Sequence, residues 1–235
     1  MTSFYTYEFD WDSKYCYPNS NVLINKLNLT NEDDLAAAEL ELAALHYAET
    51  YSTPIRGNFD LQHLQNIHRF LFCDIYEWAG ELRTVNITKG NKFCLFQFIE
   101  NAAAQAFNGL KNEDYLIGQP LDVFIKRASY YLGEINAIHP FREGNGRAQR
   151  NFIECLGKVA GYDIVWEVSQ EQMIEASANS FLKDYRLLEE ILRRITTPIS
   201  FAQQKQNARF ILSTHGPANT AFKRFERKRE QDLTR

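Results

Sequence analysis

The sequence predicts a mainly α-helical protein, a helical bundle arranged around one central helix, with one small β-hairpin beside it. Most of the chain repeats apolar residues at intervals of three and four, as helices with one buried face do. The stretch 82–98 alternates apolar and polar residues instead, which is typical of strands. Two long helical patterns, one ending at Ile138 and one beginning near Arg147, flank a loop with two glycines. This helix-loop-helix segment is the expected centre of the fold.

The bulk composition favours one substantial core. The chain has 235 residues, of which 45% are hydrophobic, and a domain of this size buries roughly 70% of its unfolded surface. The net charge of −4 gives no general attraction to nucleic acid or to anionic membranes. No apolar run reaches the roughly 18 residues of a membrane-spanning helix, and the start lacks a secretion-signal pattern. We therefore expect no nucleic-acid or membrane partner and a cytoplasmic location.

Cysteines and histidines outside the central loop show no metal-ligand spacing in the sequence. The four cysteines form no C-x-x-C pair, which favours free thiols in a reducing compartment. They are Cys16, Cys73, Cys94 and Cys155. The histidines without such spacing are His46, His63, His68 and His215.

Residues 1–30 are predicted to form an extended N-terminal arm and lead-in. Seven aromatic side chains between positions 4 and 17 partly alternate with polar ones, which favours an extended arm over a helix. Stacking of these rings on nucleobases is the alternative interpretation.

The core domain is predicted over residues 31–197 and begins with two helices. Thr30 or Asn31 can cap the first helix, whose first turn is acidic, and Asp60 can cap the second, which should close before Gly80. The apolar stripe of the first helix is Leu35, Ala38, Leu42 and Leu45. The stripe of the second is Leu61, Leu64, Ile67, Leu71 and Ile75.

Residues 82–98 are predicted to form the hairpin, with a polar tip at Lys89-Gly90-Asn91. Two strands alone are marginally stable in water, so the neighbouring helices or a guest strand should hold them. A purely structural hairpin is the alternative to one that binds a guest.

Further helices are expected on both sides of the central loop. Apolar spacing predicts them over residues 99–110, 120–138 and 147–160. Thr197-Pro198 interrupts a later helical pattern, so the core should end there. Residues 198–235 should form a C-terminal helical extension or the start of a further domain.

The loop 139–150 offers a binding site for phosphates. The Gly144-Asn145-Gly146 turn can point several N–H groups into one concavity, and the following helix adds the positive end of its dipole. Arg147 and Arg150 lie three residues apart, so both project from one helix face, and guanidinium groups suit phosphate oxygens. Together these residues predict a clamp for a polyphosphate.

Two further side chains of the loop suggest a reaction. Glu143 is a hard oxygen ligand of the kind that holds Mg²⁺ together with the phosphates of a substrate. The imidazole of His139 can accept a proton near neutral pH and so activate a hydroxyl nucleophile. The alternative is an ordinary loop, whose glycines form a turn and whose arginines lie on a solvated surface.

This span resembles the signature of Fic-domain proteins, H-P-F-x-[D/E]-G-N-G-R-x-x-R, with all nine fixed positions filled. The resemblance implies the Fic fold and the transfer of AMP from ATP to a Ser, Thr or Tyr hydroxyl of a target protein. It implies that His139 is the base and Glu143 the Mg²⁺ ligand, with Gly144 to Gly146 forming the anion nest.

The resemblance also implies roles for the remaining motif residues and for the hairpin. Asn145 and Arg147 would contact the α- and β-phosphates, and Arg150 the γ-phosphate. The stretch that begins at Arg83 resembles the family's R-T-V-x-I-x-K-G-N flap, which docks the backbone of the target. The flap residues here are Lys89, Gly90, Asn91, Lys92 and Phe93.

Many Fic proteins are silenced by a glutamate in the motif [S/T]-x-x-x-E-[G/N], which pairs with the second motif arginine, here Arg150. The sequence lacks this motif. The chain therefore resembles the class that is silenced by a small antitoxin protein supplying the glutamate, and also the Fic domains of effectors delivered into host cells. Transfer of phosphocholine, and a non-catalytic module that binds a nucleotide or a partner, are the alternatives.

Overall fold

The computed structural model describes residues 14–89 and 91–233. Most of the aromatic residues of the predicted N-terminal arm, and Gly90 of the predicted turn, lie outside the described residues. None of the helices in the described part is long and apolar enough to cross a lipid bilayer.

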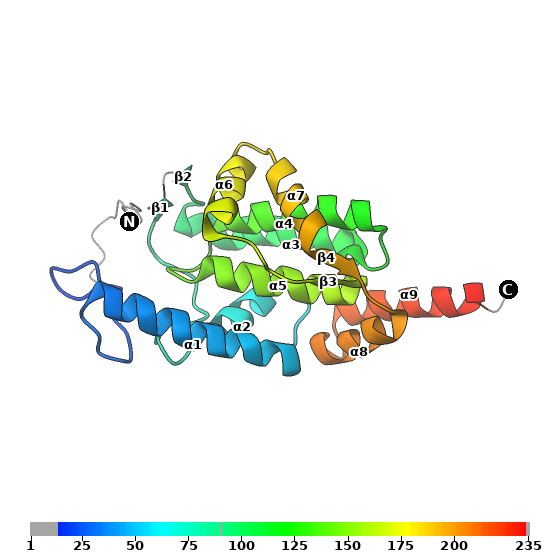
Figure 1. Ribbon diagram of the computed structural model, residues 1–235, viewed down its shortest axis with the longest axis horizontal. Helices are drawn as coiled ribbons and strands as arrows, with labels where there is room; N and C mark the ends of the chain where they lie inside the picture. Colours follow the sequence, from blue (N-terminus) through cyan, green and yellow to red (C-terminus); the bar gives the residue numbers. More distant parts are fainter. Residues whose placement is uncertain (1–13, 90, 234–235) are drawn as a thin grey trace.

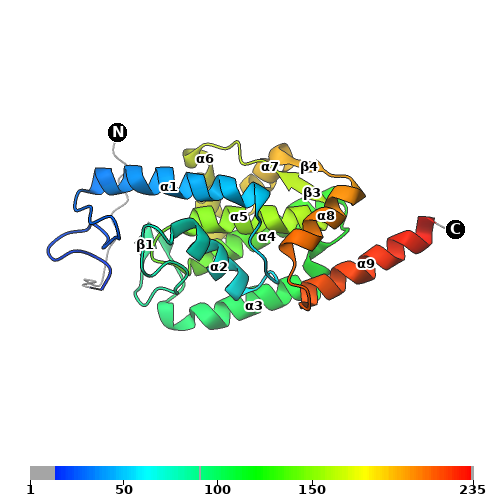
Figure 2. The same cartoon turned by 90° about the horizontal axis from the view of Figure 1, so that it is seen from below.

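Helix α5 (Asn145–Ala160) is the centre of the bundle, as the sequence predicts (Figures 1 and 2). It packs against α2 (Leu61–Phe72), α4 (Leu121–Ile138) and α8 (Phe201–Ile211). Helix α3 (Ile99–Asn112) lies along α4, and α1 (Glu32–Ser52) lies along α2 on the other side of the bundle. Helices α6 (Gln170–Phe181) and α7 (Arg186–Ile195) cover α4. The mainly α-helical fold around a central motif helix is therefore confirmed.

The central helix is placed by its own sequence. Its buried face includes the large apolar side chains Phe152, Ile153 and Leu156, spaced as the periodicity requires. Gly161 ends the helix at φ 115°, a conformation that only glycine adopts without strain. Helix α5 begins at Asn145, directly after the loop 139–144.

Helix α1 differs from its prediction in the face that it buries. Asn31 caps it, because its side chain accepts hydrogen bonds from two backbone N–H groups of the first turn. The buried row, however, runs through Leu35, Glu39 and Ala43, four residues apart, and Leu45 is 56% exposed. The prediction that Leu45 faces the core is wrong, because α1 meets the bundle along a row that includes an acid.

Helix α2 starts as predicted and ends earlier. The side chain of Asp60 caps it by accepting a hydrogen bond from the backbone N–H of His63 at 2.8 Å. The helix ends at Phe72 and not just before Gly80, and Ile75 is buried in the turns that follow.

The hairpin is present but much shorter than the predicted 82–98. Strands β1 (Thr88–Lys89) and β2 (Asn91–Lys92) pair antiparallel, and a 3₁₀ turn, η1 (Phe96–Phe98), follows. The segment before β1 is held without a strand ladder: the backbone N–H of Arg83 donates to the carbonyl of Pro140 at 2.9 Å, and its side chain donates to the carbonyl of Val85. Because two-residue strands contribute little by themselves, the flap depends on the helices beneath it.

A second antiparallel pair was not predicted. Strand β3 (Tyr162–Ile164) follows α5 and pairs with β4 (Thr196–Pro198), with Ile164 opposite Thr196. Thr197-Pro198 interrupts the helical pattern, as expected, because these residues belong to the short strand β4. This pair ties the end of α7 to the end of the central helix.

The C-terminal residues are helical, as expected. The turn η2 (Asp114–Leu116) lies between α3 and α4. After β4 the chain continues with α8 and then α9 (Pro217–Leu233). Helix α8 packs on α5 with Ala208 and Ile211 buried, while α9 projects past the rest of the bundle (Figure 1). The boundary after residue 197 stays a prediction.

Candidate active site

His139 is the first residue of the loop between α4 and α5. It caps α4 in the left-handed conformation, φ 47°, and is 8% exposed. Its Nδ1 lies 3.2 Å from the carbonyl oxygen of Asn136. Because a carbonyl only accepts hydrogen bonds, Nδ1 carries the proton of the neutral ring and the lone pair is on Nε2. The ring is thus in the tautomer that accepts a proton at Nε2.

Arg83 fixes His139 to the base of the flap, a role that spacing alone does not reveal. Its Nε donates to the carbonyl of His139 at 2.8 Å, and its Nη1 donates to the carbonyl of Val85 at 2.6 Å. Its Nη2 donates to the carbonyls of Ile138 and Cys94. The side chain is 2% exposed, and burial lowers the pKa of Arg83 to about 10, so it stays charged at neutral pH. The family's flap pattern was the one sequence signal for this residue.

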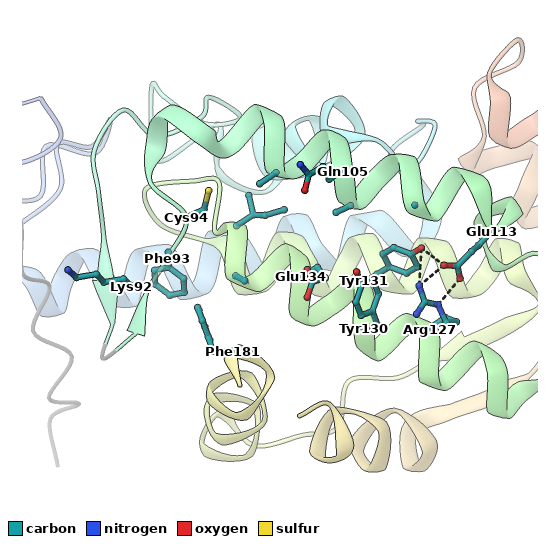
Figure 3. Close-up of a pocket in the computed structure, with 15 residues that line it drawn as sticks. Lys92, Phe93, Cys94, Gln105, Glu113, Arg127, Tyr130, Tyr131, Glu134 and Phe181 are labelled. Atoms are coloured by element: carbon teal, nitrogen blue, oxygen red, sulfur yellow. Dashed lines mark hydrogen bonds and ion pairs between the residues drawn. The ribbon is translucent and has the colours of Figure 1, made fainter. Parts of the chain in front are cut away.

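Phe93 joins the flap to the catalytic candidate. Its ring stacks on the ring of His139, with centroids 3.7 Å apart, and lies 5.4 Å from the ring of Phe181 on α6. Phe93 and Phe181 also line one end of a cavity of about 470 Å³, beside the flap (Figure 3). At its other end the cavity is lined by Tyr131 and by Arg127, which pairs with Glu113.

Lys89 lies on β1 and Asn91 and Lys92 lie on β2, with Lys89 opposite Asn91. The side chain of Lys92 is exposed.

The shape of the loop is fixed from inside. The amide of Asn145 binds the backbone of Phe141 twice, accepting from its N–H at 2.9 Å and donating to its carbonyl at 2.8 Å. The buried ring of Phe141 stacks on His68, with centroids 3.9 Å apart. His68 in turn donates from Nε2 to the carbonyl of Glu143 and accepts at Nδ1 from the N–H of Gly80, both at 2.8 Å. Burial lowers the pKa of His68 to about 3, so the ring is neutral.

Gly144 starts the anion-binding end of α5. Its φ is 79°, and a Cβ atom there would lie 2.4 Å from the ring of Phe72, so no other residue fits. The first hydrogen bond of the helix runs from the N–H of Ala148 to the carbonyl of Gly144. The N–H groups of the three residues between them therefore precede the helical ladder, where they and the dipole favour anions. Gly146, in this first turn, is exposed.

The two arginines of α5 have different surroundings. Arg147 donates to the carboxylate of Glu39 on α1 and lies over the ring of Phe72, 4.7 Å from its centroid. Arg150 is largely buried, and its guanidinium pairs with no carboxylate among the described residues. Burial, with a smaller repulsion from Arg147, lowers the pKa of Arg150. Both cations lie on α5, three residues apart, and their joint binding of phosphate stays a prediction.

Glu143 fits the role of a metal ligand. Its carboxylate is partly exposed, accepts a hydrogen bond from the N–H of Gly144 at 2.9 Å and lies 4.0 Å from Arg147. It stands at the mouth of α5, where a cation could bridge it to bound phosphates.

Comparison with known proteins agrees with this fold and site. Residues 58–156 match the Fic/DOC family. The chain is 37% identical over 186 residues to the probable protein adenylyltransferase Fic of Escherichia coli, covering 78% of this chain and 92% of that protein. The chain belongs to the Fic/DOC family.

The chain is also similar to two proteins from Bartonella. Protein adenylyltransferase VbhT of Bartonella schoenbuchensis is 42% identical over 185 residues, which cover 78% of this chain and 39% of VbhT. The N-terminal Fic domain of a VirB-translocated Bep effector from Bartonella quintana, solved with bound ADP, superposes with a TM-score of 0.75. That domain is 28% identical, and the match covers 79% of this chain and 95% of that one.

Proposed function

We propose that this chain is a protein adenylyltransferase, which transfers AMP from ATP to a hydroxyl side chain of a target protein and releases pyrophosphate. The observation that carries the proposal is the juxtaposition of the His139 imidazole, with its lone pair on Nε2, and the cationic start of α5. The names of the relatives and the ADP bound to the Bartonella quintana domain support it.

The triphosphate binds at the start of α5. The backbone N–H groups of Asn145 and Gly146 donate hydrogen bonds to its oxygens, since that of Gly144 already donates to Glu143. Arg147 and Arg150 neutralise its charge. Since the side-chain amide of Asn145 is already bound to Phe141, this residue contributes through its backbone N–H. Glu143 would hold Mg²⁺, which would supply charge neutralisation at the phosphates.

The proton moves to His139. The hydroxyl oxygen of the target forms a bond to the α-phosphorus as the bond to pyrophosphate breaks in line. Nε2 of His139 takes the hydroxyl proton, while Nδ1–H keeps its hydrogen bond to Asn136 and so holds the ring in place. Arg83 fixes the backbone of His139 during this step.

The target docks on the flap. A target segment that adds along the backbone of residues 89–93 would be registered by main-chain hydrogen bonds. Because Phe93 stacks on His139, a chain in this register brings its Ser, Thr or Tyr side chain to the imidazole.

Regulation is by a separate small antitoxin protein. Arg150 has no acidic partner in the described part of the chain, and a glutamate of the antitoxin would pair with it and displace the γ-phosphate. The enzyme acts as a toxin in the bacterial cytoplasm when the antitoxin is absent. Its likeness to VirB-translocated effectors supports the host cytosol as a second place of action.

The test uses ATP labelled at the α- or the γ-phosphate, incubated with the chain, Mg²⁺ and a cell lysate. Label should reach protein only from the α-position. Transfer from the γ-position would indicate a kinase, and no transfer from either would leave a binding module or a phosphocholine transferase, which labelled CDP-choline distinguishes.

A further inference from the structure

His46 on α1 meets the consecutive residues Cys73 and Asp74 in the turn after α2. Nε2 of His46 lies 3.0 Å from Oδ2 of Asp74, and Sγ of Cys73 lies 3.7 Å from Oδ1 of Asp74. The ligand atoms of the three residues all lie within 4.8 Å of one another. None of the three residues belongs to the loop 139–150 or has a part in the proposed reaction.

We propose that His46, Cys73 and Asp74 form a binding site for Zn²⁺. Zinc binds imidazole nitrogen, thiolate and carboxylate at about 2.0–2.3 Å, so tetrahedral ligands lie roughly 3.3–3.7 Å apart. The two contacts, 3.0 Å to Oδ2 and 3.7 Å to Oδ1 of Asp74, lie close to this separation, and all three ligand atoms lie within 4.8 Å of one another. Tetrahedral coordination would bring these atoms to that separation through side-chain movements, since they lie within 4.8 Å of one another.

Glu49 supplies the outer contact that zinc-bound histidines have. Nδ1 of His46 is buried and lies 3.7 Å from Oε2 of Glu49, one turn along α1, without a hydrogen bond among the described residues. Metal-binding histidines usually donate their second ring N–H to a carboxylate, which fixes the tautomer. In the described structure Nε2 of His46 donates to the carboxylate of Asp74. On zinc binding the ring proton would lie on Nδ1, facing Glu49, and the Nε2 lone pair would bind the metal.

The surroundings are those of a site with an open position. The side chain of His46 is 14% exposed and packs edge-on against Phe70, while that of Asp74 is 61% exposed. Three protein ligands leave a fourth position that water can fill. A thiolate and an imidazole select zinc or a similar transition metal over Mg²⁺, which prefers oxygen ligands. The site is therefore chemically distinct from Glu143.

Zinc here would fasten α1 to the end of α2. Helix α1 carries Glu39, which holds Arg147, and α2 carries Phe72, which packs on Gly144. The bound metal would stabilise the folded chain and keep these contacts in place. This inference does not depend on the proposed function.

The experiment titrates the untagged, reduced and chelator-treated chain with Co²⁺ in the absence of nucleotide, then with Zn²⁺. We expect one equivalent of Co²⁺ to produce a thiolate-to-cobalt charge-transfer band, and Zn²⁺ to remove it. Zn²⁺ should also raise the Tm of the chain. A native chain without the charge-transfer band would overturn the proposal.

Variants separate this site from adventitious binding. Cys73→Ser should abolish the charge-transfer band, and Glu49→Gln should weaken Co²⁺ binding by about 10- to 100-fold. Cys16→Ser, at another partly exposed cysteine, is the matched control and should keep the band. If Cys73→Ser does not fold, Asp74→Asn at the exposed ligand gives the same test through a loss of affinity. A band that survives Cys73→Ser, or affinity unchanged in Asp74→Asn, would exclude the site.

Discussion

The carboxylate of Glu39, on α1, accepts a hydrogen bond from the guanidinium of Arg147, the first arginine of α5. The hydroxyl of Tyr76 donates to the other oxygen of the same carboxylate, and burial together with Glu39 raises the pKa of Tyr76. A group expected to bind phosphate is thus held by a buried acid on another helix, 108 residues away in sequence.

Glu39→Gln should tighten ATP binding severalfold. The phosphates and Glu39 compete for Arg147, and the amide is a weaker competitor than the carboxylate. Folding stability should fall by about 1.5–3 kcal/mol, because a hydrogen bond between charged groups is lost. Calorimetric titration with ATP, in a His139→Ala background to prevent turnover, measures the affinity. Glu41→Gln, at an exposed acid of the same helix, is the control. Weaker binding in Glu39→Gln would mean that Glu39 orients Arg147 for phosphate.

His139→Ala should leave ATP binding nearly unchanged and reduce AMP transfer by about 10²- to 10⁴-fold, the usual contribution of a general base. Initial rates of transfer from α-labelled ATP, together with the Kd for ATP, check this split. His215→Ala, at an exposed histidine, should behave as the native chain. Retained transfer in His139→Ala would remove His139 from the role of base.

Arg83→Lys should lower kcat while changing the KM for ATP little. The lysine ammonium cannot span the carbonyls of His139, Val85 and Cys94 that the guanidinium fork joins. The position of the His139 imidazole relative to the flap should then vary, although no group proposed to contact ATP is altered. Steady-state kinetics with varied ATP test this, with Arg186→Lys at an exposed site as control. A change confined to KM would place Arg83 with the nucleotide.

The chain should lose stability as the pH falls below about 6.5. Burial lowers the pKa of His63 to about 4 and that of His68 to about 3, so both are neutral when folded and take up protons on unfolding. Between pH 6.5 and 4 each removes up to about 1.4 kcal/mol per pH unit, whereas above pH 6.5 neither contributes. Urea unfolding at pH 7.5 and pH 5 measures the difference. Equal stability at both values would contradict buried neutral histidines.

The sequence alone predicted the features that depend on residues close together in the chain. The caps Asn31, Asp60 and Gly161 are local signals, and each has the predicted place in the structure. The central helix was predicted from its apolar spacing. The phosphate site was predicted from residues that are adjacent in the loop 139–150. Roles of individual loop residues in ATP binding remain predictions.

What the sequence did not predict depends on contacts between distant residues. Arg83 and His139 are 56 residues apart, and no periodicity relates them. The burial of Glu39 and not Leu45 depends on how α1 lies against α2. The β3–β4 pair has three residues per strand, too few for an alternating pattern to stand out.

The ring of Phe93 has one neighbour in the imidazole of His139 and another in the empty space between flap, α3 and α4. A small molecule bound in that cavity would contact the ring of Phe93 and displace the imidazole of His139 that stacks on it. None of the proposed phosphate-binding residues 143–150 lines this cavity, so such an inhibitor would not compete with the phosphates of ATP. Selective compounds against this enzyme are therefore better sought there than among nucleotide mimics.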